Sequence, residues 1–414
     1  MSNESAAVRH RPTPAGILIG LMAANTAVDA VSRMSTVSSR LASLDILRGV
    51  VMVLMAIDHV RVYSGVPAGG PSAGVFFTRW VTHFCAPIFV FLAGTSAFLH
   101  VRKLGDKGAL AKYLVTRGLM LVVLELTVIR TAWTFNVDYG GLVLAGVIWM
   151  LGWCMVLLAA LIWLPTWAVG FVGFLIVAGQ SLLPAIASGS GASTQWLWQF
   201  LYLGGEVRFG ETGPTITILY TLIPWIGVMA LGYACGAVVV MESSARQRIL
   251  LRLGVAATAL FLVVGGVMLF TAAPSDDGMP ALFRLLNQQK YPASPMFLLM
   301  TLGPAIALLP VADRARNGIA DALDTFGRVP LFYYLLHIPL IHTTALIVWY
   351  LRDGAFGAER FATAPYVFIQ DPQQQWSLSL LYLVFAIDVA ILYVACRWYM
   401  HLKATRPRAW MRYV

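Results

Sequence analysis

The feature that most constrains this chain is a series of about ten apolar stretches, most of them near the roughly 20 residues that a helix needs to cross a bilayer. Hydrophobic residues make up 59% of the 414 residues and charged residues only 12%. A soluble domain carries about 25% charged residues, so too little charge is present to cover a water-facing surface. The sequence predicts an all-α fold, a polytopic transmembrane bundle of about ten helices. The expected spans are 42–60, 83–100, 113–132, 141–162, 166–184, 215–238, 253–272, 296–311, 329–350 and 376–396.

Three parts follow from this pattern. Residues 1–39 are predicted to be a poorly ordered extension, with an apolar stretch at 15–24 that is too short to span a membrane. A signal peptide would explain it, but Met34 would begin a tidier protein, and we favour an artefact of start-site choice. The transmembrane domain is expected over 40–400, and a basic cytoplasmic tail over 401–414.

The basic residues predict the orientation. With the N-terminus inside, the larger share of Lys and Arg falls in the inner segments, which places both termini in the cytoplasm. The net charge of +10 is spread between apolar runs, so a nucleic-acid partner is not expected. We expect a multi-pass protein of the cytoplasmic (inner) membrane in contact with lipid, and the sequence leaves homodimerisation open.

Several chemistries lack their motifs. The four cysteines form no C-x-x-C pair, so neither a disulfide framework nor a metal site is expected. No G-x-x-x-x-G-K-[ST] loop for nucleotides and no G-x-S-x-G elbow occurs. This argues against an ATP-driven pump and against a serine hydrolase of that kind.

Ionisable residues within the spans are the functional candidates, because a charge in the bilayer is costly. Asp45 and Arg48 lie three residues apart on the first span and share a face. They either form a salt bridge that anchors the helix end, or Arg48, with Arg40, meets a phosphate group from the cytoplasm.

A second layer lies at the other end of the first span. Asp58 stands ten residues, about 15 Å of helix, beyond Arg48. With His59, and with His83 at the start of the next span, it predicts a carboxylate–imidazole centre for general-base chemistry. The plainer alternatives are an Asp58–Arg61 pair and an interfacial role for His83.

Three later features add candidates. His337 lies in an apolar span one turn after Tyr333 and Tyr334, and it either joins the centre or bonds a neighbouring helix. Lys290 and Tyr291 are in an outer loop, where the lysine anchors the interface or faces a cavity mouth. We group both with Arg40, Asp45 and Arg48 as candidate donor-binding residues.

Together, a basic inner mouth and a base-like outer centre suit transfer of a group across the membrane. A cytoplasmic donor with phosphates would dock inside, and an acceptor would wait outside. A proton-coupled transporter or exporter would use the same residue types, and a haem protein would use paired histidines.

Five ordered motifs carry a resemblance. They are RLASLDILRG at 40–49 with MAIDH at 55–59, THFCAPIFVFLAG at 82–94, LIPWIGVM at 222–229, KYP at 290–292 with TLGP at 301–304, and FGRVPLFYYLLH at 326–337. They resemble the heparan-α-glucosaminide N-acetyltransferase catalytic-domain family, and most closely its bacterial branch. The likeness runs from about 40 to 400.

The resemblance implies a transmembrane acyltransferase, an N- or O-acetyltransferase that takes acetyl from cytoplasmic acetyl-CoA to an extracytoplasmic glycan or small-molecule acceptor. It places Asp45 and Arg48 on the donor side. It places Asp58, His59 and His83 near the acyl-transfer centre, with His337 lining that centre. The lysosomal enzyme has asparagine at the position of Asp58 and its key histidine in the following loop, where this chain has none. We therefore expect His59 or His83 to take the proton while Asp58 orients it, and an acyl-histidine intermediate stays open.

Overall fold

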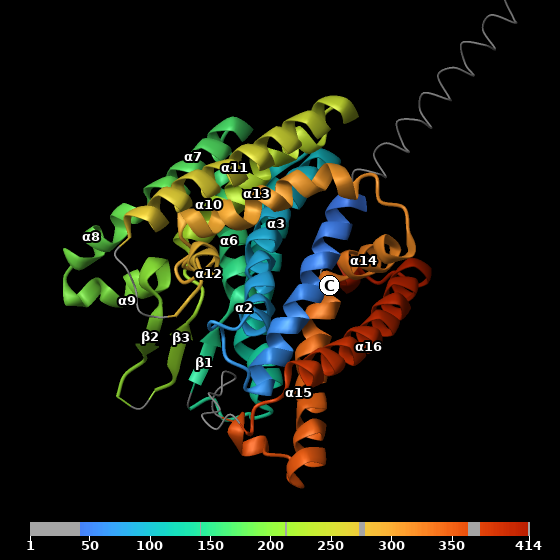
Figure 1. Cartoon of the computed structure of the whole chain (residues 1–414). Coiled ribbons are helices and arrows are strands. Elements are labelled where there is room, and N and C mark those ends of the chain that lie inside the picture. The colour runs from blue at the N-terminus through green and yellow to red at the C-terminus, as the bar shows by residue number, and fades with distance from the viewer. Residues whose placement is uncertain (1–41, 141, 212, 273–277, 363–372, 413–414) are drawn as a thin grey trace, which may run out of the picture.

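A computed structural model describes residues 42–140, 142–211, 213–272, 278–362 and 373–412 (Figure 1). Helices dominate this part of the chain. The predicted extension 1–39 and the candidate residue Arg40 lie outside the described residues. The division into three parts stays a prediction, although the last long helix ends at Thr405, inside the expected tail.

Within the described residues, six helical segments are long and apolar enough to cross a membrane. They are Ala73–Leu104, Thr166–Ser188, Ser243–Thr271, Pro295–Ala312, Pro330–Asp353 and Leu378–Thr405. Two shorter apolar helices, Val147–Leu161 and Ile223–Val239, accompany them. Each predicted span contains a helix, so the chain is mostly helical with several candidate membrane helices. The cytoplasmic placement of the termini stays a prediction.

The helices follow one another along the chain. The first helix covers 42–64. The others are α2 (Ala73–Trp80), α3 (Cys85–Leu104), α4 (Lys107–Leu124), α5 (Arg130–Thr134), α6 (Val147–Leu161), α7 (Thr166–Gly179), α8 (Leu183–Ser188), α9 (Gln195–Trp198), α10 (Ile223–Val239), α11 (Ser243–Thr271), α12 (Ala281–Leu286), α13 (Pro295–Ala312), α14 (Gly318–Arg328), α15 (Pro330–Asp353) and α16 (Leu378–Thr405). A π-helical turn, Glu125–Ile129, joins α4 to α5.

A small sheet departs from the all-α expectation. It has the order β1-β3-β2, with β1 (Leu142–Ala145) parallel to β3 (Thr215–Ile218) and β2 (Gly205–Arg208) antiparallel to β3. The span expected from residue 215 therefore begins as a strand, because its Thr-Ile-Thr-Ile run is β-branched throughout. The helix starts only at Ile223, with Pro224 in its first turn. The sheet fixes the entry to α6 beside the entry to α10.

Glycines set the closest helix contacts. A Cβ on Gly94 of α3 would lie 2.0 Å from the Met229 carbonyl oxygen of α10. A Cβ on Gly327 of α14 would lie 1.8 Å from the Asp45 carbonyl oxygen of the first helix. Such approaches let backbones pack directly, as small residues do in membrane bundles. The second contact holds α14 against the first helix at the Arg48 end.

A helix cap and an ion pair stabilise the helix ends at the Arg48 end of the bundle. Hydrogen bonds from the Ser244 hydroxyl and from the Ser244 and Ala245 backbone N–H groups lower the pKa of Glu242 to about 2, and the carboxylate caps α11. Arg246 of α11 pairs with Asp313, which follows α13, at 2.8 Å, and both side chains are buried. These contacts tie α11 to α13, which also pack along their lengths.

Candidate active site

Two histidines from distant parts of the chain meet in the bundle. Nδ1 of His59, on the first helix, lies 2.7 Å from Nε2 of His337, on α15. The rings are stacked with their centroids 4.8 Å apart, and Trp133 packs against His59 in an edge-on contact. His337 is fully buried. The distance is that of a hydrogen bond and leaves no room for a metal ion between the two nitrogens.

The backbone around His337 sets the direction of this hydrogen bond. Nδ1 of His337 lies 2.7 Å from the Tyr334 carbonyl oxygen and 3.2 Å from that of Tyr333. A carbonyl oxygen can only accept, so this Nδ1 carries the proton and donates. In the neutral ring, Nε2 is then the acceptor, and it receives the Nδ1–H of His59. The remaining nitrogen of His59, Nε2, therefore carries a lone pair that can take a proton.

Asp58 is paired with Arg61 and acts on His59 only through its charge. Its carboxylate accepts from Arg61, with the closest nitrogen–oxygen distance at 3.0 Å. Arg61 also donates to the Val66 carbonyl oxygen and so closes the end of the first helix. The plainer alternative, an Asp58–Arg61 pair within the first helix, is therefore present. The residue hydrogen-bonded to His59 is His337.

His83 lies at the same end but outside the histidine pair. It is buried, and its Nδ1 lies 3.1 Å from the Arg79 carbonyl oxygen and 3.4 Å from Nη1 of the Arg79 side chain. Its ring packs against Phe297 of α13. Asp58 and Arg79 both act on it electrostatically.

Lys290 and Tyr291 also lie at the His59 end, in the loop between α12 and α13. The charge of Lys290 acts on Asp58, His59 and His83. The two loop residues are therefore separate from Arg48, with which the sequence had grouped them as donor-binding residues.

A cavity of about 340 Å³ opens at the other end of the first helix. It lies among the first helix, α3, α4, α6 and α15, and most of its wall is apolar. Polar and basic side chains gather where the first helix begins and α3 ends. They are Arg48, Ser96, His100, Tyr113, Arg117, Arg328 and Lys403.

Arg48 is held in place at this mouth. One of its nitrogens lies 2.6 Å from Asp45 and 2.9 Å from the Gly327 carbonyl oxygen, and the other lies 3.1 Å from the Ser96 hydroxyl. The salt bridge considered as the plain alternative is thus present. The same guanidinium lines the cavity, so the two interpretations coexist.

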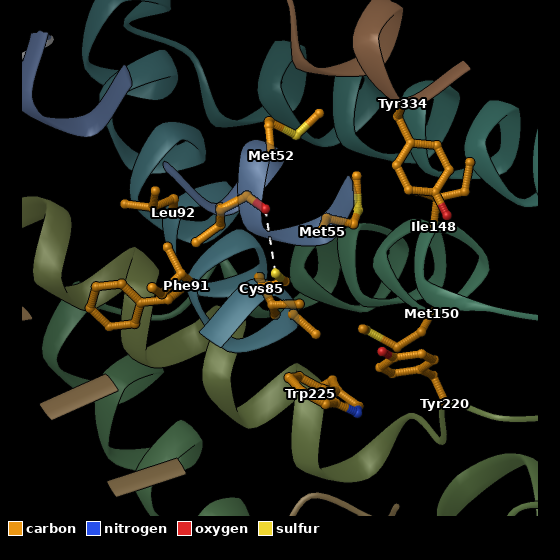
Figure 2. Packing of buried hydrophobic residues seen from close by; sticks show 14 of the residues in the cluster. Met52, Met55, Cys85, Phe91, Leu92, Ile148, Met150, Tyr220, Trp225 and Tyr334 are labelled. Atoms are coloured by element: carbon orange, nitrogen blue, oxygen red, sulfur yellow. Dashed lines mark hydrogen bonds between the residues drawn. The ribbon is translucent and has the colours of Figure 1, made fainter. Parts of the chain in front are cut away.

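The cavity extends along the first helix toward the histidine pair, although neither histidine lines it. Met55 lines the cavity and lies four residues before His59 on the same helix, and Tyr334 lines it three residues before His337. One helical turn, about 5.4 Å, separates each lining residue from its histidine. Figure 2 shows Met52, Met55, Tyr334 and Ile148 gathered in this part of the core. A chain-like group that enters at Arg48 would therefore end beside His59.

Sequence reasoning missed part of the basic mouth. Arg117 lies within the third predicted span and lines the cavity, while Glu125 of the same span accepts from the Ile148 N–H at the start of α6. Lys403 falls in the expected tail, yet α16 carries it to the cavity, where Arg117 acts on it electrostatically. Arg328 ends α14 and pairs with Asp324 at 2.7 Å. The usable signal was the spacing of basic residues near the ends of successive spans.

Two other buried ionisable side chains lie outside the histidine pair. Asp388 of α16 is fully buried and accepts from Thr344 at 3.1 Å. His342 donates from Nδ1 to the Ala132 carbonyl oxygen and stacks on Phe135 and Tyr63. Among the residues that the structure describes, no three His, Cys, Asp or Glu side chains gather as metal ligands would.

Comparison with known families gives one assignment. The model of "Heparan-alpha-glucosaminide N-acetyltransferase, catalytic" matches residues 40–271, which is more than half of the chain. The matched stretch holds Arg48, Asp58, His59 and His83, whereas Lys290 and His337 follow it. A search of curated proteins finds no match. The family comprises membrane acetyltransferases that use acetyl-CoA, and this chain belongs to it.

Proposed function

We propose that the protein moves an acetyl group from cytoplasmic acetyl-CoA to a sugar amine or hydroxyl on the far side of the membrane. The observation that carries this proposal is the cavity, which begins at a basic mouth and ends one helical turn from the His59–His337 pair. The larger share of Lys and Arg at the Arg48 side favours a cytoplasmic mouth. We also propose the cytoplasmic (inner) membrane as the site of action. The motifs at 290–292 and 326–337, beyond the matched stretch, support placement in the bacterial branch of the family.

The donor would bind in two parts. Its phosphates meet Arg48, Arg117, Arg328 and Lys403 at the mouth, where several cationic donors are needed for a phosphate clamp. Its extended thioester arm lies along the apolar wall past Met52 and Met55. From Arg48 to His59 the first helix rises about 16 Å, which sets the depth that the arm must reach.

The chemistry is a direct transfer. Nε2 of His59 takes the proton from the acceptor amine or hydroxyl, which attacks the thioester carbonyl carbon. The new C–N or C–O bond forms as the C–S bond breaks, and the proton passes from His59 to the leaving thiolate to give free CoA. His337 accepts the Nδ1–H of His59 throughout and so stabilises the imidazolium that forms.

The test is calorimetry of acetyl-CoA binding to wild type, Arg48→Ala and His59→Ala, each followed by a transfer assay. Binding that weakens in Arg48→Ala and persists in His59→Ala, with transfer lost in the latter, supports the proposal. Thermal unfolding of Arg48→Ala is the control, because Arg48 also contacts Asp45 and Gly327. Wild type that binds no acyl-CoA removes the donor, and flux of a solute in liposomes without any acyl donor would then favour a transporter.

A further inference from the structure

Lys290 is a buried lysine that forms no ion pair in the described structure. It is only 7% exposed. Its ammonium lies 5.2 Å from the ring centre of Tyr291 and 5.8 Å from that of Tyr220. Its backbone bridges to that of Ala293, but in the part of the chain that the structure describes its ammonium group makes neither a hydrogen bond nor an ion pair. A buried ammonium is costly unless something compensates its charge, and ring faces compensate it only in part.

The charges around Lys290 do not balance it. Asp58 is the carboxylate that acts on His59 and His83, and Arg61 already holds it at 3.0 Å. Arg79 adds a further positive charge that acts on both Asp58 and His83. Within the described residues, the electrostatic neighbourhood of His83 and Asp58 thus holds three cationic side chains and one carboxylate. Such a cluster attracts an anion.

The same loop presents an aromatic surface. Tyr291 is 37% exposed, and its hydroxyl lies 3.4 Å from that of the buried Tyr220, which packs on Trp225. Figure 2 shows Tyr220 and Trp225 next to Met150, in the same close-up as Met55. A ring face beside a cation provides one surface for the apolar side of a sugar and one charge for an acidic substituent.

We propose that Lys290 binds an anionic group, a carboxylate or a phosphate, on the acceptor that His59 deprotonates. This inference rests on the proposed function and narrows its acceptor from sugars in general to acidic sugars. Lys290 and Tyr291 are accordingly acceptor-binding residues. The acid sits beside the acylated amine or hydroxyl on the same molecule, which explains why a buried cation stands so near the histidine centre.

The experiment compares matched acceptors on the full-length protein. For transfer to an amine, glucosamine is the probe without an acidic group, muramic acid adds a carboxylate, and glucosamine 6-phosphate adds a phosphate. For transfer to a hydroxyl, glucose, glucuronate and glucose 6-phosphate form the same series. We expect at least one acidic probe in wild type to exceed its neutral counterpart in kcat/KM by about tenfold or more, the scale of one charged hydrogen bond. Which acid responds distinguishes carboxylate from phosphate.

Variants assign the preference to this residue. Lys290→Met should abolish the preference for the acidic probe while leaving acetyl-CoA binding at the opposite end unchanged, which also shows that the variant is folded. Lys290→Arg should keep most of it. Arg208→Met, which removes an exposed charge from β2, should behave as wild type. The inference is overturned if wild type binds acetyl-CoA yet acylates neutral probes equally well or acylates none, or if Lys290→Met keeps the preference. Absence of acetyl-CoA binding would instead overturn the proposed function.

Discussion

Nε2 of His337 accepts the Nδ1–H of His59 across 2.7 Å, although 278 residues separate the two in sequence. The carbonyl oxygen of Tyr334 fixes the orientation of the His337 ring, and the His337 ring fixes the orientation of the His59 ring. A neutral imidazole and a main-chain carbonyl thus take the place that a carboxylate holds in many acid–base pairs. The arrangement suits a membrane interior, where a second buried charge would be costly.

Replacing the histidines should affect the chemical step and not the binding of the donor. His59→Ala removes the base, and we expect kcat to fall by about 10² to 10⁴ with acetyl-CoA affinity unchanged. His337→Ala leaves the His59 Nδ1–H without its acceptor and should lower kcat by a smaller factor, whereas His337→Gln, whose amide oxygen can accept, should recover part of it.

The double variant separates a coupled pair from two independent residues. Because His337 acts through His59, His59→Ala/His337→Ala should be no slower than His59→Ala alone. Steady-state kinetics with the split of kcat from KM provides the measurement. Effects that simply multiply would show that the hydrogen bond does not couple the two residues in catalysis.

Much of this architecture follows from local pattern. Apolar length places a helix in each predicted span, although α11 begins ten residues before its predicted start and α16 ends nine residues after its predicted end. Positions i, i+3 place Asp45 with Arg48 and Asp58 with Arg61. The His59–His337 contact does not follow, since it depends on how α15 packs against the first helix, which periodicity does not encode. The sheet was hidden for a related reason: β1 and β3 are short apolar runs that read as helix starts until they pair with each other.

The basic mouth was only partly predictable. Arg48 stands out because it lies in an apolar helix, whereas Arg328 and Lys403 follow or end such helices and look like ordinary topology signals. Lys290 was recognised as a candidate, but its partners were not predictable from the sequence. Its loop position suggested a cavity mouth, but only the packing against Tyr220 and Tyr291 assigns it to the His59 end.

Removing a positive charge from the mouth should weaken donor binding. Arg328 lines the cavity, and its side chain is 54% exposed, so Arg328→Ala leaves little buried structure behind. We expect the Kd for acetyl-CoA to rise by about tenfold, since a charge-assisted hydrogen bond to phosphate contributes roughly 1.5–3 kcal/mol. Calorimetry at low and high salt is the measurement, and the salt dependence should flatten in the variant. Arg208→Ala, at exposed β2, is the control; equal losses in both variants would point to net charge and not to a clamp.

Adding a methyl group at Gly327 should displace the backbone that holds Arg48 at the cavity mouth. The added Cβ would sit 1.8 Å from the Asp45 carbonyl oxygen, so α14 must move away from the first helix. The move would break the 2.9 Å hydrogen bond from Arg48 to the Gly327 carbonyl oxygen. Gly327→Ala should cost about 1–3 kcal/mol of stability, as overpacking does, and should weaken acetyl-CoA binding.

Gly318 of the same helix offers a matched control, because its Cβ would meet nothing within 4 Å. Thermal unfolding and calorimetry of both variants decide the matter. If Gly318→Ala weakens donor binding as much as Gly327→Ala, the close approach is not the cause.

The preference of the protein for short acyl groups should depend on Met55. This side chain lines the deep end of the cavity, one turn before His59. Met55→Ala should enlarge that end and raise the use of butyryl-CoA relative to acetyl-CoA. Met300→Ala shortens a buried methionine of α13 outside the cavity lining and should cost comparable stability, about 2–5 kcal/mol, without changing the ratio of the two donors. An unchanged ratio in Met55→Ala would place the thioester elsewhere.

The buried ion pair between Arg246 and Asp313 should respond to single and double replacement in opposite ways. Its nitrogen and oxygen lie 2.8 Å apart, and the two side chains are only 3% and 6% exposed. One further atom of each, Nη1 of Arg246 and Oδ1 of Asp313, is buried without a hydrogen bond among the described residues. Arg246→Met leaves an uncompensated carboxylate and should cost about 3–5 kcal/mol. Arg246→Met/Asp313→Leu removes both charges and should restore most of that stability, because neither desolvation cost remains. Thermal unfolding in one detergent compares wild type with Arg246→Met, Asp313→Leu and the double variant. A double variant as unstable as Arg246→Met would mean that the pair contributes more than it costs to bury.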